Sequence, residues 1–198
     1  MDYKDYQNTR DAAWNILLDC GIDRLPVDLN CICRQLGVGV YRYGDVTVTG
    51  ETALQGDGLL YFEGNRPVIL FNQDKPAVRI RFTVAHELGH LILGHVAAEQ
   101  GSAVNRDFSV ATDSVEAAAN QFAVRLLAPA CVLWGIEAYT AGEIARLCNI
   151  SLRAAQFRAE RMLALRERKK FLTSELEQRV YKQFLPFIRE ARQIPPGE

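Results

Sequence analysis

The run His-Glu-Leu-Gly-His at residues 86–90 constrains this chain of 198 residues more than any other feature. It lies within residues 77–93, where apolar side chains recur at helical spacing and predict the strongest helix of the chain. Positions i and i+4 of a helix share a face, so the imidazoles of His86 and His90 can converge on one metal ion. Glu87 follows the first histidine, where its carboxylate can take a proton from a water molecule activated by zinc. The motif therefore predicts a zinc site at which Glu87 is the catalytic base.

The alternative is that these two histidines are solvated on the surface of a helix. The same face also carries Phe82 and Leu93, which indicates that it is at least partly buried. Unpaired histidines on a buried face would cost free energy, so the context favours a metal site over a coincidence of spacing.

A catalytic zinc ion needs a third protein ligand. The downstream candidates are one histidine and four acidic residues: His95, Glu99, Asp107, Asp113 and Glu116. His95 follows Gly94 at the expected end of the helix, so we expect it to point away from the site, in a surface or capping role. Glu116 opens a second expected helix, over 115–128, where it borders an apolar stripe and would need a cation or hydrogen bonds. Periodicity alone leaves Glu116 evenly balanced between a metal ligand and a glutamate stabilised by its own helix dipole.

Composition limits the class of protein. The net charge of −1 argues against a generic nucleic-acid binder, and the 48% hydrophobic content suffices for a core. The polar N-terminal residues lack the apolar run of a signal peptide, and no segment approaches the ~18 apolar residues of a membrane span. The five cysteines lack the spacing of a zinc knuckle or a thioredoxin-type motif, so we expect reduced packing residues. Together these features predict a cytoplasmic protein with no membrane partner.

The expected order of elements is helices, then a small antiparallel sheet, then helices, which is an α+β fold. Two short apolar runs, 58–62 and 67–71, flank the residues Glu-Gly-Asn-Arg and predict a β-hairpin. The polar stretch 96–113 lies between the predicted ligands. We expect it to border the cleft and act as a gate for the substrate.

The C-terminal part predicts a helix-turn-helix. Thr140 and Glu143 fit a capping box, and a turn at 148–150 precedes a second helix that Ser151 can cap. Seven basic and two acidic residues within 153–170 give a net charge of +5, a stripe that could contact phosphates. The alternative is a small helical domain with a solvated charged face. DNA binding through 140–170 is therefore open but not favoured over docking of a protein partner.

An amphipathic helix is expected over 174–191, with a kink at Pro186. Its apolar face would pack on the core or form a homodimer, and the sequence does not decide between the two.

Two blocks of sequence resemble the ImmA/IrrE family of metallo-endopeptidases. The first is Arg-Phe-Thr-Val-Ala-His-Glu-Leu-Gly-His at 81–90. The second is Glu-Ala-Ala-Ala-Asn-Gln-Phe-Ala at 116–123, followed by Leu-Leu-Ala-Pro, in which Ala128 replaces the methionine of the family pattern. Two blocks in this order make the resemblance specific, and it covers roughly residues 10–165.

The resemblance implies the ligand set. It makes Glu116 the third zinc ligand beside His86 and His90, and it makes Asn120, one turn further along, a partner that orients the Glu116 carboxylate. An oxyanion stabiliser is expected opposite the metal. The candidates for that role are two residues upstream of the motif, Tyr61 and Arg79.

The resemblance also implies the architecture and the substrate. It predicts a zincin-like peptidase domain at 1–135, followed by a helical region resembling helix-turn-helix at 136–198. Family members cut a helix-turn-helix repressor, often encoded nearby, and so switch on genes of mobile elements and stress responses. The expected function is thus a zinc endopeptidase that derepresses transcription. The alternatives are a DNA-binding regulator with a structural or sensory zinc site and a protein that binds a repressor without cutting it.

Overall fold

The computed structural model describes residues 3–45, 56–96 and 113–193. Contacts divide the chain into two compact units: unit 1 is Met1–Thr9 with Leu29–Ala123, and unit 2 is Arg10–Asp28 with Val124–Glu198. Two helices, α1 (Tyr3–Asp19) and α4 (Asp113–Leu127), contribute residues to both units. The predicted domain boundary after residue 135 stays a prediction.

A three-stranded sheet in the order β1-β3-β2 is the centre of unit 1. The predicted hairpin is confirmed, because β2 (Gly58–Glu63) and β3 (Arg66–Phe71) pair in antiparallel fashion around Gly64, whose φ is 60°. However, β1 (Gly39–Arg42) pairs with β3 in parallel, so the sheet is mixed rather than antiparallel throughout. The reason is that β1 borders β3, the second strand of the hairpin. The hairpin turn reverses the chain, so β3 runs in the same direction as β1.

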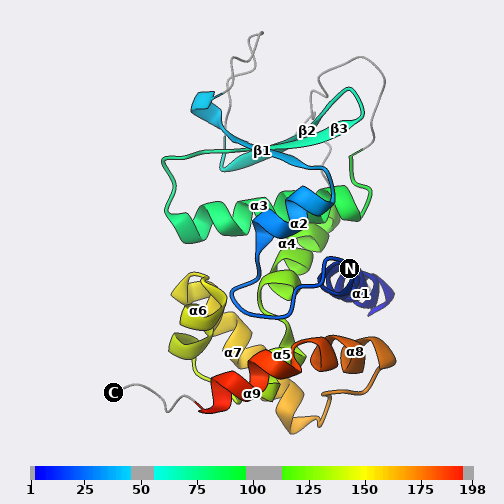
Figure 1. Cartoon of the computed structure of the whole chain (residues 1–198), viewed down its shortest axis with the longest axis vertical. Helices are drawn as coiled ribbons and strands as arrows, with labels where there is room; N and C mark the ends of the chain where they lie inside the picture. The colour runs from blue at the N-terminus through cyan, green and yellow to red at the C-terminus, as the bar shows by residue number, and fades with distance from the viewer. Residues whose placement is uncertain (1–2, 46–55, 97–112, 194–198) are drawn as a thin grey trace. The chain divides into compact units, whose positions relative to one another are not determined.

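Helix α3 (Ala77–Ile92) runs across one face of this sheet (Figure 1). Its bounds agree with the helix predicted at 77–93. Leu60 and Ile69 are fully buried on the facing side of the strands, and Leu88 of α3 is 1% exposed. Helix α2 (Leu29–Gln35) contacts both α3 and β1. Apolar packing between the sheet and these helices therefore fixes the position of the helix that carries the His-Glu-Leu-Gly-His motif.

Unit 2 is helical in its described part. Besides its shares of α1 and α4, it contains α5 (Ala130–Gly135), α6 (Ala141–Cys148), α7 (Leu152–Glu167), α8 (Glu175–Gln183) and α9 (Leu185–Gln193). The observed helices and mixed sheet make the chain an α+β protein, as predicted.

The helix-turn-helix shape predicted for the C-terminal part is present in α6 and α7, which pack against each other. The capping box is confirmed: Thr140 Oγ1 accepts from the Glu143 amide at 3.3 Å, and Glu143 Oε2 accepts from the Thr140 amide at 3.0 Å. Asn149 ends α6 in the left-handed conformation at φ 51°, and Ser151 accepts a hydrogen bond from the Ala154 amide at the start of α7.

The segment predicted as one kinked helix over 174–191 forms two helices, α8 and α9, which meet at Phe184. Pro186 is the second residue of α9. A proline in the first turn of a helix loses no intrahelical hydrogen bond, so a new helix can start there where a continuous one would be interrupted.

The stretch Asp113–Gly135 has the length and the mean hydropathy, 1.2, of a membrane-spanning helix. It also contains Glu116, and 67% of its most apolar window is buried within the structure. Such burial is typical of core helices in soluble proteins, which pass the same test of length and composition.

Candidate metal centre

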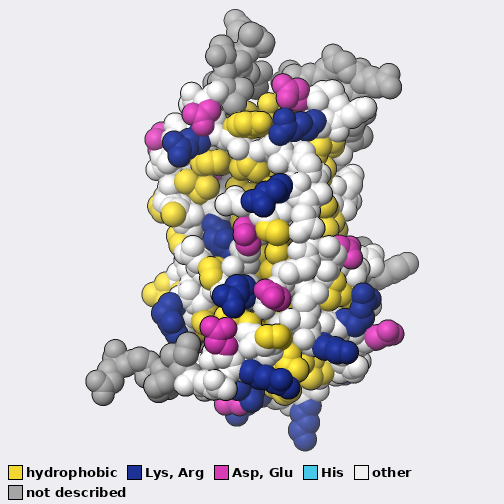
Figure 2. Space-filling view, viewed as in Figure 1, with side chains coloured by type: hydrophobic (Ala, Val, Ile, Leu, Met, Phe, Trp, Pro, Cys, Tyr) yellow, Lys and Arg dark blue, Asp and Glu magenta, His cyan; other side chains and the backbone are white. Residues whose placement is uncertain are grey.

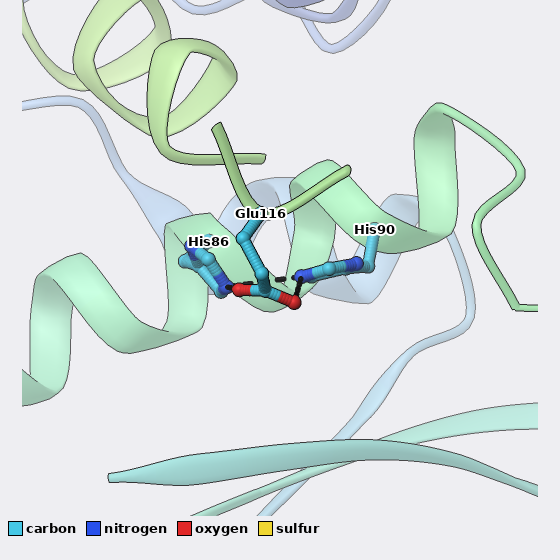
Figure 3. Close-up of side chains that lie close together, drawn as sticks. All are labelled: His86, His90 and Glu116. Atoms are coloured by element: carbon cyan, nitrogen blue, oxygen red, sulfur yellow. Dashed lines mark hydrogen bonds and ion pairs between the residues drawn. The ribbon is translucent and has the colours of Figure 1, made fainter. Parts of the chain in front are cut away.

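Three side chains from two helices converge in unit 1: His86 and His90 of α3 and Glu116 of α4 (Figure 3). The Nε2 atom of His86 lies 3.2 Å from Glu116 Oε2, and the Nε2 atom of His90 lies 3.3 Å from Glu116 Oε1. The two Nε2 atoms are 3.0 Å apart. The structure thus brings together the three residues that the motif and the resemblance nominate as ligands.

The donor set and its spacing fit a zinc ion. Two imidazoles and one carboxylate are a known set of protein ligands for catalytic zinc, which keeps a further coordination position open. Ligand atoms about 2.0–2.1 Å from a tetrahedral ion lie roughly 3.3 Å from one another. The distances of 3.0 to 3.3 Å between donor atoms are close to that value.

The three ligands differ in exposure. The His90 side chain is 3% exposed and that of His86 is 15% exposed, whereas the Glu116 side chain is 42% exposed. The centre is therefore closed on the side of α3 and reachable from solvent on the side of α4. This asymmetry suits a site that must admit a substrate.

Each ligand histidine also has a partner at its other ring nitrogen. His86 Nδ1 lies 3.1 Å from Asn120 Oδ1, and His90 Nδ1 lies 3.2 Å from His95 Nδ1. An amide oxygen only accepts hydrogen bonds, so Nδ1 of His86 carries the proton and its Nε2 presents a lone pair. Asn120, which was expected to orient the Glu116 carboxylate, thus lies at His86.

His95 does not point away from the site, contrary to expectation. Gly94, at φ 71°, turns the backbone back at the end of α3, and the His95 amide donates to the His90 carbonyl oxygen at 2.9 Å. This left-handed glycine closure brings the side chain after it over the last turn of the helix. The glycine at position 94 is a sequence signal from which this reversal of the backbone could have been predicted.

Glu87, the predicted base, is 4% exposed and lies where α3 meets the start of β2. A Cβ atom on Gly58 would lie 2.3 Å from Thr83 Cγ2 and 3.8 Å from Glu87 Cγ, so glycine permits this close approach. Tyr43, at the start of a short 3-10 turn (Tyr43–Asp45), has a raised pKa. The causes are burial first and then the negative charges of Glu87 and Asp57. Tyr43 thus senses the charge of the base, and no motif in the sequence indicated this residue.

The oxyanion roles of Tyr61 and Arg79 stay predictions. Successive residues of a strand point to opposite faces, so Tyr61 lies on the face of β2 opposite to that of Gly58, which meets α3. The guanidinium of Arg79 forms an ion pair with the carboxylate of Asp57. Most of the segment predicted as a gate, residues 97–112, lies outside the described residues.

The sequence agrees with a known family over most of this unit. The family model of the IrrE N-terminal-like domain, peptidase family M78, matches residues 42–160, a segment that includes all three ligand residues. A comparison with curated proteins gave no match. Because the matched segment covers more than half of the 198 residues, the chain belongs to the peptidase M78 family of metallopeptidases.

Proposed function

We propose that this chain is a zinc-dependent endopeptidase in which His86, His90 and Glu116 hold the ion and Glu87 is the general base. The observation that carries the proposal is the convergence of the three donor groups at distances of 3.0 to 3.3 Å. The buried carboxylate of Glu87, the residue next to the first ligand, supports the assignment of the base.

Zinc, when bound, acidifies water and polarises a carbonyl group. Glu87 accepts a proton from the attacking water molecule and donates it to the amide nitrogen of the leaving peptide. Low solvent access at Glu87 strengthens its electrostatic interactions with the reacting groups. Asn120 holds His86 in the tautomer that a ligand needs.

The proposed substrate is a helix-turn-helix repressor in the cytoplasm, whose cleavage releases the genes it represses. Membership of the peptidase M78 family, together with the resemblance of both motif blocks to ImmA/IrrE proteins, supports this substrate class. The partly exposed side chain of Glu116 supports access for a protein segment.

The surface of α7 favours protein docking over DNA binding. Arg158, one of the residues of the predicted basic stripe, is 6% exposed and donates to the carbonyl oxygen of Ala128. Phe157 and Leu152 are 62% and 56% exposed on the same helix. On the face drawn in Figure 2, Lys and Arg side chains are interspersed with Asp and Glu. Burial of Arg158 removes one basic side chain from any surface that could contact DNA, and the exposed apolar side chains of α7 offer a surface to a protein partner.

The decisive experiment is a cleavage assay on the repressor encoded nearest to this gene. Zinc-loaded wild type is compared with Glu87→Gln and with Glu175→Gln, a matched control that is exposed at the start of α8. We expect wild type and Glu175→Gln to cut, and mass spectrometry of the fragments to locate one bond. Cleavage by Glu87→Gln at the wild-type rate would exclude the mechanism. Tight binding of an uncut repressor by wild type would favour the non-cleaving alternative.

The DNA-binding alternative is tested by a mobility-shift assay on DNA upstream of the regulated genes, with salt varied. We expect no sequence-specific shift. A specific complex that survives at physiological salt would favour the regulator with a structural or sensory zinc site.

A further inference from the structure

We propose that His95 is a positioning residue of the metal centre. It accepts a hydrogen bond from Nδ1–H of His90 and thereby keeps the lone pair of His90 Nε2 directed at the ion. This inference rests on the zinc site of the proposed function and adds a residue that is not itself a ligand.

The contact between the two rings has the geometry of a hydrogen bond. The Nδ1 atoms lie 3.2 Å apart, and the rings meet edge to face, with centroids 5.1 Å apart and planes at 74°. A neutral imidazole carries one N–H and one lone pair, so a bond between two Nδ1 atoms needs one ring of each tautomer. One of the two histidines must therefore donate through Nδ1 while the other accepts.

The position of Glu116 decides which ring donates when the ion is bound. His90 Nε2 faces Glu116 Oε1 at 3.3 Å, on the side where the three donor groups converge. A metal ligand must present a lone pair, so the proton of His90 has to be on Nδ1. His95 must then accept through its own Nδ1 and carry its proton on Nε2.

Each of the two ligand histidines thus has a hydrogen-bond acceptor at its Nδ1 atom, but the two acceptors differ in chemistry. Asn120 supplies an amide oxygen to His86, and His95 supplies an imidazole nitrogen to His90. A partner of this kind fixes both the tautomer and the orientation of a ligand ring. Both acceptors are neutral, so neither adds a charge to the centre.

The backbone holds His95 in place independently of its ring. Gly94 turns the chain back at φ 71°, and the His95 amide donates to the His90 carbonyl oxygen at 2.9 Å. The His95 side chain also lines a cavity of about 340 Å³, together with Thr9 of α1 and with Ser114 and Ala118 of α4. His95 thus contacts both this cavity and His90, whose side chain is only 3% exposed.

Two substitutions of similar size separate the acceptor from mere packing. Asparagine at position 95 places its carbonyl oxygen close to where Nδ1 was, whereas leucine offers no acceptor. The zinc Kd of the full chain is measured for His95→Asn, His95→Leu and wild type by competition with a chromophoric chelator. We expect His95→Leu to bind zinc about 10–100-fold more weakly than wild type and His95→Asn to stay close to wild type.

The results separate this proposal from the zinc site itself. A wild-type Kd for His95→Leu, or equal losses in His95→Leu and His95→Asn, would overturn the role of His95 and leave the ligand set intact. Failure of wild type to bind zinc would overturn both. The melting temperatures of the metal-free proteins show whether the variants fold.

A second measurement needs no substitution. Long-range ¹H–¹⁵N NMR correlations of the zinc-loaded wild type report which ring nitrogen of each histidine carries a proton. We expect His95 protonated on Nε2 and accepting through Nδ1. A proton on Nδ1 of His95 in the zinc-loaded protein would overturn the proposal.

Discussion

Gly89 of α3 lies directly against Ala119 of α4: a Cβ atom on Gly89 would be 3.1 Å from the Ala119 carbonyl oxygen and 3.2 Å from its Cα. The absence of a side chain lets the two helix backbones approach at this point. Glu116 lies one turn before Ala119, and His86 and His90 flank Gly89. The glycine within the motif therefore sets the distance between the third ligand and the other two.

Replacing this glycine should weaken the metal site. We expect Gly89→Ala to raise the zinc Kd, because α4 must move by a few tenths of an ångström to accept the methyl group. This loss of zinc affinity should occur even though alanine stabilises an exposed helix interior by about 1 kcal/mol relative to glycine. The measurement is zinc competition with a chelator, combined with thermal denaturation.

The matched control is Gly142→Ala in α6, where an added Cβ would meet no described atom within 4 Å. It should leave the zinc Kd unchanged. Zinc binding by Gly89→Ala at wild-type strength would show that the close contact does not govern the ligand distance.

Glu116 is predicted to contribute directly to zinc affinity. Glu116→Ala removes one of three protein ligands, so its zinc Kd should rise by about 100-fold or more, beyond the usual cost of losing an outer partner. Asp113→Ala is the control, since Asp113 is exposed at the start of the same helix. Equal zinc affinities for Glu116→Ala and wild type would remove Glu116 from the ligand set.

The capping box of α6 should contribute to the stability of unit 2. Thr140→Ala removes the acceptor of the Glu143 amide and should lower the free energy of unfolding by about 1 kcal/mol. Urea denaturation of the metal-free protein measures this change. An unchanged midpoint and slope would indicate that the cap is dispensable.

The same box predicts a pH dependence. The hydrogen bond from the Thr140 side chain is the main cause that lowers the pKa of Glu143, against the opposing effect of burial. A lowered pKa in the fold means that the carboxylate stabilises the protein above the pKa it has when unfolded, and that this stabilisation is lost as pH falls through the folded pKa. Glu143→Gln should therefore be less stable than wild type at neutral pH, and the difference should shrink in acid. A difference that stays constant down to about pH 3 would contradict this account.

The elements of the fold were predictable because each has a local cause. Helical spacing located α3, the turn residues after β2 located the hairpin, and Thr140 with Glu143 located the start of α6. The pairing of β1 was not predictable, because its direction depends on which strand of the hairpin it borders. The pairing of strands that are far apart in the sequence produces no periodic pattern from which it could be predicted.

The ligand set was predictable, but its surroundings were not. The helical spacing of the two histidines is enough to predict them as metal ligands. For Glu116, only the family resemblance favours a metal ligand over a role in stabilising its own helix. Asn120 shares a helix face with Glu116, yet its amide contacts His86 on the other helix. The left-handed turn at Gly94 returns His95 to the end of α3, which the apolar spacing of the helix does not indicate.

X-ray absorption at the zinc edge of the purified, zinc-loaded chain tests the central claim most directly. The account predicts one ion with imidazole and carboxylate donors at about 2.0–2.1 Å and no sulfur. The chain offers five cysteines as competing ligands, four of them buried. A sulfur scatterer at about 2.3 Å, or a spectrum without imidazole, would contradict a site built from His86, His90 and Glu116.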